Sequence, residues 1–311
     1  MRKTGFGVHL PVMGFGGGDL SREKIIAFAR KAEELGYNSL SVNDHIVFRT
    51  SWLDALSTLS SVASVTNKIK LGTSILNIVV RNPVISAKAL SAIDILSSGR
   101  LFVGVGPGSH KGDYDACGIS FEDRWPRFNE AVEVLSRLWT DPKVDYSGRF
   151  YKLEGVSVEP RSFQKPHPPI LIGSWGSKAG LKRVAKFGDG WMASAYNITP
   201  ETFKERWKMV LSYRKELGKD VESFENSIMT MFGYISSDKE KVHKKAREIL
   251  APALGRSSEE LEKFLLFGTP DECEHKLRNY VNAGVQRIHF WPIGDYIEQI
   301  ELFKREVIPN L

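Results

Sequence analysis

The sequence is poor in cysteine and contains no long apolar run. Its two cysteines, Cys117 and Cys273, lie far apart, and no His-x-x-x-His or Cys-x-x-Cys spacing is present. Two isolated thiols cannot form a closed zinc site, so we expect neither a disulfide nor a bound metal. No stretch approaches the roughly 20 apolar residues of a membrane helix, and the first residues show no signal-peptide pattern. These absences predict a cytoplasmic protein without a membrane partner.

The sequence also lacks a concentration of charge of one sign. Its 43 Lys and Arg residues outnumber its 37 Asp and Glu residues, which gives a formal net charge of +6. The charges are scattered along helical stretches such as Glu201–Lys215 and Lys239–Arg247, and they form no basic arm. We therefore expect no nucleic acid partner. An anionic small-molecule cofactor or substrate explains the surplus at least as well.

What the sequence does have is a repeated alternation of short apolar stretches with longer amphipathic ones. The short stretches predict strands, and the helical spacing of apolar residues in the longer ones predicts helices. Strands are predicted at residues 4–10, 37–42, 69–76, 101–105, 170–172, 191–195, 226–235 and 286–291, each leading to a helix. Eight such units without a break in composition favour a (β/α)8 TIM barrel that forms a single domain, residues 1–311.

The alternative to a barrel is a doubly wound open sheet. That fold has a Gly-x-Gly-x-x-Gly turn after its first strand, where the backbone approaches a dinucleotide. The run Gly14–Gly18 does not have this spacing, and Gly104–Ser109 lacks the final glycine. The closed barrel is therefore the favoured interpretation.

Two segments interrupt the alternation. Asp141–Pro169 contains a predicted hairpin, Val144–Leu153, and is too rich in proline for a barrel helix. We expect it to lie at the barrel mouth as an inserted lid or wall. Residues 251–267 predict a helical insertion, and Thr269 followed by Pro270 predicts the N-cap and first residue of the next helix.

The active site of a barrel forms where its strands end and the following loops begin. Asp44 and His45 come directly after the second predicted strand, so a carboxylate stands beside an imidazole that exchanges protons near neutral pH. This makes His45 the candidate catalytic residue. Position alone leaves open the alternative of a surface pair without a function.

Two glycine-rich strand exits are candidate ligand sites. Gly173–Ser177 precedes a predicted helix, and the free N–H groups at a helix N-terminus suit a phosphate, with charge added by Lys178 and Lys182. The alternative is a tight, well-capped turn. Gly104–Gly108 would let the backbone approach a flat ligand, although its spacing alone favours an irregular turn.

Six short strings in order along the chain carry a resemblance to a known family. They are Ser-Val-Asn-Asp-His at 41–45, Lys-Leu-Gly-Thr-Ser-Ile at 70–75, Ala-Ile-Asp-Ile-Leu-Ser-Ser-Gly-Arg-Leu at 92–101, Gly-Val-Gly-Pro-Gly at 104–108, Pro-Pro-Ile-Leu-Ile-Gly at 168–173 and Phe-Gly-Asp-Gly-Trp at 187–191. The strings lie between residues 41 and 191, and the resemblance itself covers almost the whole chain. The sequence resembles the luciferase-like oxidoreductases, the superfamily of the luciferase-like monooxygenases.

The resemblance implies a (β/α)8 barrel that forms a homodimer and holds FMN or coenzyme F420 at its C-terminal mouth. It implies a non-prolyl cis peptide bond in the third strand, here Ser74–Ile75, a reactive His45 and a ring contact from Asp44. The implied cofactor-binding residues are Asp44, Thr73, Ser74, Ile75, Asn77, Gly106, Pro107, Gly108, Gly173, Ser174, Trp175, Gly176 and Ser177. The implied substrate-contacting residues are Trp52, Ser109 and Trp291.

Ser109 departs from the deazaflavin enzymes that the chain otherwise resembles. The sugar-phosphate dehydrogenases carry glutamate at this place, and the methylene-tetrahydromethanopterin reductases carry aspartate. We therefore interpret the chain as an F420-dependent reductase or dehydrogenase that transfers a hydride to or from a small organic substrate of open identity. The alternatives are an FMN-dependent luciferase-like monooxygenase, a flavoprotein that only binds, and a non-redox barrel enzyme. The last usually needs a barrel-end Schiff-base lysine or a metal cluster, and we find neither.

Overall fold

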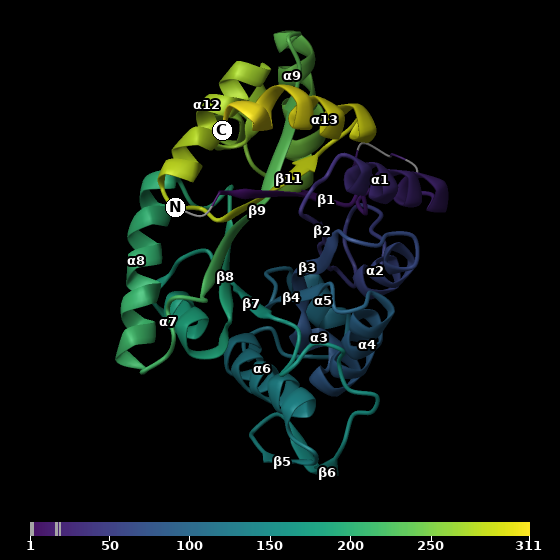
Figure 1. The fold of residues 1–311 in the computed structure, drawn as a ribbon, viewed down its shortest axis with the longest axis vertical. Helices are drawn as coiled ribbons and strands as arrows, with labels where there is room; N and C mark the ends of the chain where they lie inside the picture. Colours follow the sequence, from purple (N-terminus) through teal and green to yellow (C-terminus); the bar gives the residue numbers. More distant parts are fainter. Residues whose placement is uncertain (1–2, 16–17, 19) are drawn as a thin grey trace.

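The computed structural model describes residues 3–15, 18 and 20–311, and a closed parallel barrel lies at its centre (Figure 1). The barrel strands are β1 (Gly5–His9), β2 (Ser39–Val42), β3 (Lys70–Asn77), β4 (Leu101–Gly106), β7 (Ile170–Gly173), β8 (Gly190–Ser194), β9 (Glu225–Ile235) and β11 (Arg287–Pro292). They pair in this order, and the parallel pairing of β11 with β1 closes the ring. The predicted (β/α)8 barrel is confirmed, and every predicted strand is present. Part of the run Gly14–Gly18 lies outside the described residues.

Helices cover the outside of the barrel. They are α1 (Arg22–Glu34), α2 (Ala55–Ala63), α3 (Ile78–Arg81), α4 (Pro83–Leu96), α5 (Lys111–Ala116), α6 (Arg124–Thr140), α7 (Lys178–Phe187), α8 (Pro200–Glu216), α9 (Lys239–Lys245), α12 (Pro270–Asn282) and α13 (Tyr296–Leu302), with short turns at Phe303–Val307 and Ile308–Asn310. The predicted N-cap at Thr269 is confirmed as a capping box: its hydroxyl accepts the N–H of Glu272, whose carboxylate accepts the N–H of Thr269.

The region after β9 is only partly as predicted. The π-helical turn Ala246–Leu250, α10 (Ala251–Leu254) and α11 (Ser258–Phe264) confirm the helical insertion. Leu266–Gly268, however, form the short strand β10, which pairs with β9 outside the barrel ring. Gly233 makes this pairing possible, because a Cβ there would lie 2.4 Å from the Leu266 carbonyl oxygen.

β5 (Val144–Ser147) and β6 (Lys152–Val156) form the predicted hairpin, which projects beside α6 at one end of the molecule (Figure 1). The Glu130 carboxylate on α6 accepts three consecutive backbone N–H groups from residues 149–151. These bonds fasten the hairpin tip to the outer side of α6, close to the helix start at the barrel mouth. No described residue of 141–169 lines the cavity at that mouth. The segment therefore packs on α6 and forms no wall of this cavity.

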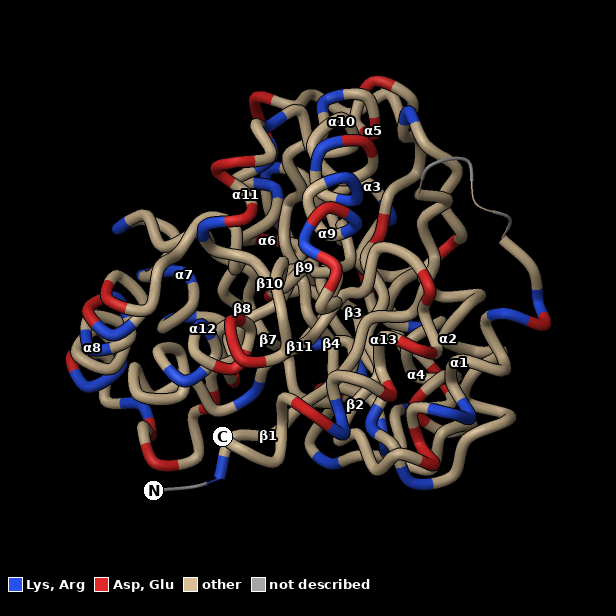
Figure 2. The backbone as a smooth tube through the Cα atoms, turned by 90° about the horizontal axis from the view of Figure 1, so that it is seen from above, with Lys and Arg blue, Asp and Glu red and all other residues tan. Residues whose placement is uncertain are grey.

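Charged residues lie on the periphery of the molecule. Figure 2 shows Lys and Arg interspersed with Asp and Glu over the outer helices, while the central strands carry few charges. Within the described ranges, none of the helices combines the length and the apolar character that a bilayer crossing requires.

Candidate active site

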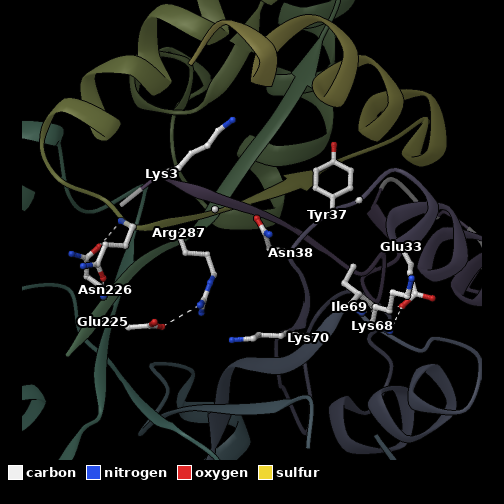
Figure 3. A pocket seen from close by; sticks show the side chains of 13 residues that line it. Lys3, Glu33, Tyr37, Asn38, Lys68, Ile69, Lys70, Glu225, Asn226 and Arg287 are labelled. Carbon is white, nitrogen blue, oxygen red and sulfur yellow. Dashed lines mark hydrogen bonds and ion pairs between the residues drawn. The ribbon is translucent and has the colours of Figure 1, made fainter. Parts of the chain in front are cut away.

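One cavity lies at the N-terminal end of the barrel strands (Figure 3). It has a volume of about 510 Å³, and its walls include Lys70, Glu225 and Arg287, the first residues of their strands. Glu225 contacts Arg287 at 3.1 Å, and Glu33 accepts backbone N–H groups of residues 67–69. Because the N-terminal face of a barrel usually serves stability, and because both carboxylates have partners, we assign no reaction to this cavity.

A second cavity, of about 430 Å³, lies at the C-terminal ends of β2, β3, β4, β7, β8 and β9. It is lined by Asn43, Asp44, His45, Ser74, Ile75, Gly106, Pro107, Gly108, Ser109, Asp113, Phe121, Arg124, Trp125, Gly173, Ser174, Trp175, Ser177, Met192, Ala193, Ser194, Tyr196, Met229 and Thr230. Most of the residues that the sequence predicted therefore meet in one place, at the end of the barrel where active sites form.

Ile75 projects into this cavity from β3. The Ser74–Ile75 peptide bond is cis, as the family resemblance implied. The neighbouring strands make room for the Ile75 side chain: a Cβ on Gly106 would lie 3.0 Å from it, and a Cβ on Gly173 2.7 Å. Met192 and Met229, which also line the cavity, belong to the small apolar cluster against which Ile75 packs. These residues form a narrow apolar support with no polar side chain of its own.

His45 lies where β2 ends, with 17% of its side chain exposed. Its Nδ1 is 2.8 Å from an oxygen of Asp113, a residue of α5 that the sequence analysis did not single out. The ring also packs against Phe48 and Trp52, with ring centroids 4.5 Å and 4.7 Å away. A single sequence gives no sign of the pairing, because 68 residues separate His45 from Asp113.

Asp44, the neighbour of His45, is fully shielded and already has partners. Its carboxylate accepts hydrogen bonds from Arg81 Nε at 2.7 Å and Nη2 at 2.5 Å, and from the backbone N–H of Asn77 at 3.2 Å. Burial opposes the charge of Arg81, but hydrogen bonds and attraction from Asp44 and Asp54 raise the pKa of its guanidinium. Asp44 is thus one of the residues around the cavity, but its carboxylate is shielded and its charge is balanced by Arg81.

The turn Gly173–Ser177 leads from β7 into α7, as predicted. The Ser177 hydroxyl caps α7 by accepting the N–H of Gly180 at 3.1 Å, and Ser174 Oγ accepts the N–H of Gly176. Among the described residues, the backbone N–H groups of Trp175 and Ser177 have no hydrogen-bond acceptor. These donors at a helix N-terminus remain available to an anion.

The cations beside this turn differ from the predicted ones. Lys178 and Lys182 do not line the cavity, and the Lys182 ammonium lies 5.6 Å above the ring of Tyr213. Arg124, at the start of α6, lines the cavity instead, with its guanidinium 3.9 Å from the centre of the Phe121 ring. Both lysines lie on α7, the helix predicted to follow the turn, but their side chains do not line the cavity.

Five of the predicted residues lie near the cavity without lining it: Trp52, Thr73, Asn77, Gly176 and Trp291. Trp52 packs edge-on against the ring of His45, which does line the cavity. Trp291 is 1% exposed and stacks on His9 at 3.4 Å, so it fills the barrel interior and is not a wall for the substrate. The sequence alone does not distinguish a tryptophan that fills the barrel interior from one that lines the cavity.

The wall formed by β8 and β9 was not predicted. Thr230 has φ 57°, a left-handed conformation that is rare for a β-branched residue and that concentrates at functional sites. Its hydroxyl lies 3.0 Å from that of Ser194, and both side chains line the cavity beside Tyr196. Burial raises the pKa of Tyr196, so its hydroxyl stays protonated. This wall offers hydroxyl groups to the polar edge of a ligand.

The side chains around this cavity are suited to an organic ligand and not to a metal ion. It combines one imidazole, one unneutralised arginine and several hydroxyl groups around an apolar floor. In the part of the chain that the structure describes, no three His, Cys, Asp or Glu side chains converge to hold a metal. Fold and site together define a (β/α)8 barrel with a candidate active-site cavity at the C-terminal ends of its strands.

The chain belongs to the luciferase-like monooxygenase family, whose model matches residues 6–287. It is 27% identical to the F420-dependent glucose-6-phosphate dehydrogenase of Segniliparus rotundus, over 93% of each chain. It is 26% identical to the 5,10-methylenetetrahydromethanopterin reductase of Methanolobus tindarius, over 92% of this chain and 95% of that protein. The protein is thus an oxidoreductase of this family.

The fold agrees with that of a solved barrel structure. An F420-dependent secondary alcohol dehydrogenase, in complex with an F420–acetone adduct, superimposes with a TM-score of 0.86 at 22% identity, covering 99% of this chain and 98% of the other. At this identity the likeness establishes the barrel alone.

Proposed function

We propose that the protein is a coenzyme F420-dependent oxidoreductase that transfers a hydride between the deazaflavin and a small organic substrate. The observation that carries the proposal is one cavity with His45 at the end of β2, Ile75 on β3 and the Gly173–Ser177 turn after β7. The F420-dependent dehydrogenase of Segniliparus rotundus, similar over almost its whole length, supports the choice of cofactor.

The residues of the cavity fit a flat ring that carries a phosphate. Ile75 would support the ring, and Gly106 and Gly173, which have no Cβ, make room for its side chain. The free N–H groups of Trp175 and Ser177, with Arg124, would hold the phosphate. When bound, F420 supplies a ring carbon that accepts or donates a hydride.

His45 provides the proton transfer that hydride transfer requires. In the oxidation direction, an alcohol loses a hydride from carbon and a proton from oxygen, so that its C–H and O–H bonds are replaced by a C=O bond. His45 receives that proton, and in the reverse direction it returns it to the carbonyl oxygen. Phe48 and Trp52 around the imidazole reduce the access of water to this transfer.

The charges of the cavity favour a neutral substrate. Among the described lining residues, Arg124 is the one Lys or Arg, and the two carboxylates, Asp44 and Asp113, lie on the side of His45. If Arg124 serves the cofactor phosphate, no lysine or arginine remains for a second phosphate. We therefore propose an uncharged alcohol or carbonyl compound and not a sugar phosphate.

A substrate panel tests this function. The purified protein is mixed with oxidised F420 and a series of neutral alcohols, with glucose 6-phosphate for comparison, while the absorption of the oxidised deazaflavin is followed. We expect at least one alcohol to reduce F420 and glucose 6-phosphate to be inactive. The proposal fails if no alcohol reduces F420 and no ketone or aldehyde oxidises its reduced form.

An FMN-dependent monooxygenase is the second candidate, because the family model itself describes monooxygenases. The same apolar floor and phosphate donors would hold FMN. This candidate predicts product formation that consumes oxygen, whereas the F420 enzyme turns over under anaerobic conditions. Turnover with and without oxygen therefore separates the two.

We also propose, from the family resemblance, that the protein is a homodimer. Sedimentation equilibrium would then give twice the 34.9 kDa of one chain. A mass of one chain at micromolar concentration would reject this assembly.

A further inference from the structure

The side chain of Asp113 connects two loops of the active site. It lies in the first turn of α5, only 2% of it is exposed, and its two oxygens have different partners. Oδ2 accepts a hydrogen bond from His45 Nδ1 at 2.8 Å. Oδ1 accepts the backbone N–H groups of Ile46 and Val47, at 2.9 Å and 2.8 Å. One carboxylate thus holds both the imidazole and the loop that carries it.

Asp113 is ionised where it contacts the imidazole. Burial alone would raise its pKa, but the hydrogen bond from His45 and the N–H groups of Val47 and Ile46 outweigh burial and lower it. An ionised carboxylate has no proton to donate. The hydrogen between Asp113 and His45 must therefore sit on Nδ1.

The other ring nitrogen of His45 is left free for chemistry. Nε2 has no hydrogen-bond partner among the described residues, and it is not shielded from the cavity that His45 lines. The rings of Phe48, Trp52 and His110 surround the imidazole at centroid distances of 4.5, 4.7 and 5.7 Å. Rotation of the ring would break the Asp113 bond and these contacts together.

We propose that Asp113 is the positioning residue that holds His45 as its Nδ1–H tautomer, so that Nε2 is the atom that exchanges a proton with the substrate. The catalytic part of this inference rests on the function proposed above. The tautomer itself does not, because the carboxylate and the imidazole meet without any ligand. A histidine oriented through its second nitrogen is a common arrangement at catalytic and metal sites.

The substitution Asp113→Asn distinguishes the two roles of this side chain, which are to orient the His45 imidazole and to hold the loop at Ile46 and Val47. Its amide oxygen still accepts the N–H groups of Ile46 and Val47, while its NH₂ group now faces His45 and donates to Nδ1. Nδ1 must then give up its hydrogen, and the hydrogen moves to Nε2. The loop is retained, but the lone pair that should face the substrate is lost.

The test uses ¹⁵N NMR of the histidine side chains in the protein without cofactor, with the His45 signals assigned by comparison with His45→Gln. We expect neutral His45 to be the Nδ1–H tautomer in the wild type and the Nε2–H tautomer in Asp113→Asn. With F420 and an active substrate, kcat of Asp113→Asn should fall about 10²–10⁴-fold. The Kd for F420 should change less than twofold.

Asp115→Asn is the matched control, because Asp115 lies on the same helix, is 58% exposed and pairs with Lys111. It should leave both the tautomer and kcat unchanged. A wild-type His45 with its hydrogen on Nε2, or an Asp113→Asn protein that keeps the wild-type tautomer, would overturn the proposal. If the tautomer changes as expected but no F420 turnover exists in the wild type, the proposed function fails and the positioning role stands.

Discussion

Asp44 and His45 are neighbours in sequence with different surroundings. His45 has one face in the cavity and a free Nε2, whereas the Asp44 carboxylate is shielded from solvent and bonded to Arg81. A buried charge pair is strongly destabilised when one partner is removed, because the other charge is left without compensation. The two residues should therefore respond differently to substitution.

His45→Ala should lower kcat by about 10²–10⁴-fold and leave the Kd for the cofactor almost unchanged, because only proton transfer is lost. Asp44→Ala should lower the free energy of unfolding by about 3 kcal/mol, since Arg81 keeps Asp54 alone as its partner. Urea denaturation and steady-state kinetics on both variants measure these effects. The assignment is wrong if His45→Ala unfolds as easily as Asp44→Ala, or if it keeps wild-type turnover.

A buried histidine makes stability depend on pH. Burial lowers the pKa of His9 to about 3, and its Nε2 has no hydrogen-bond partner among the described residues. Between pH 6.5 and 3 the unfolded chain binds a proton that the folded protein does not. The free energy of unfolding should therefore fall as the pH decreases through this range, with a contribution of up to about 1.4 kcal/mol per pH unit.

His9→Phe keeps an aromatic ring against Trp291 and removes this proton site. Urea titrations of both proteins at several pH values should show a shallower decline for the variant below pH 6.5. Equal slopes for the two proteins would show that His9 is not buried in its neutral form. Above pH 7 the two slopes should agree, because His9 is then neutral in both states.

At the scale of elements, the turn before α7 depends on Gly176. Its φ of 88° is left-handed, and a Cβ would lie 2.4 Å from Arg206, which donates to the Trp175 carbonyl at 3.1 Å. A side chain at this position is strained by the left-handed backbone and crowds Arg206, so we expect it to disturb the turn that presents the N–H groups of Trp175 and Ser177. The turn is therefore the element on which phosphate binding depends.

Gly176→Val should weaken cofactor binding at least about 10-fold, which corresponds to the loss of roughly 1.4 kcal/mol, about one hydrogen bond to a charged group. Gly218→Val is the matched control: Gly218 also has a left-handed φ, of 65°, but has nothing within 4 Å and lies beyond the end of α8. Both variants pay a similar backbone strain. Calorimetric titration should show weaker binding for Gly176→Val alone, and equal affinities for the two variants would contradict the phosphate site.

At the scale of the whole molecule, the barrel was predictable because its signals are local. Alternating apolar stretches predicted every barrel strand, and Thr269 with Pro270 predicted the start of α12. The rule that sites form at the C-terminal strand ends pointed to His45 and Ser174, and the structure places both in one cavity with Ile75. β10 was missed, because three residues are too few to show a period.

The parts that could not be predicted depend on contacts between distant segments. Asp113 reaches His45 across 68 residues, and Arg81 reaches Asp44 across 37. Sequence periodicity shows which face of a helix is apolar, but not which polar side chain of a neighbouring loop it meets. The left-handed Thr230 is a further case, because β-branched residues give no signal for that conformation.

The central claim is that the cavity at the C-terminal end of the barrel binds F420. Equilibrium titration of the purified, cofactor-free protein with F420 and, separately, with FMN tests it most directly, because the absorption bands of the two differ. We predict saturable 1:1 binding of F420 that Gly176→Val weakens and Gly218→Val does not. Tight binding of FMN with no detectable binding of F420 would contradict the account.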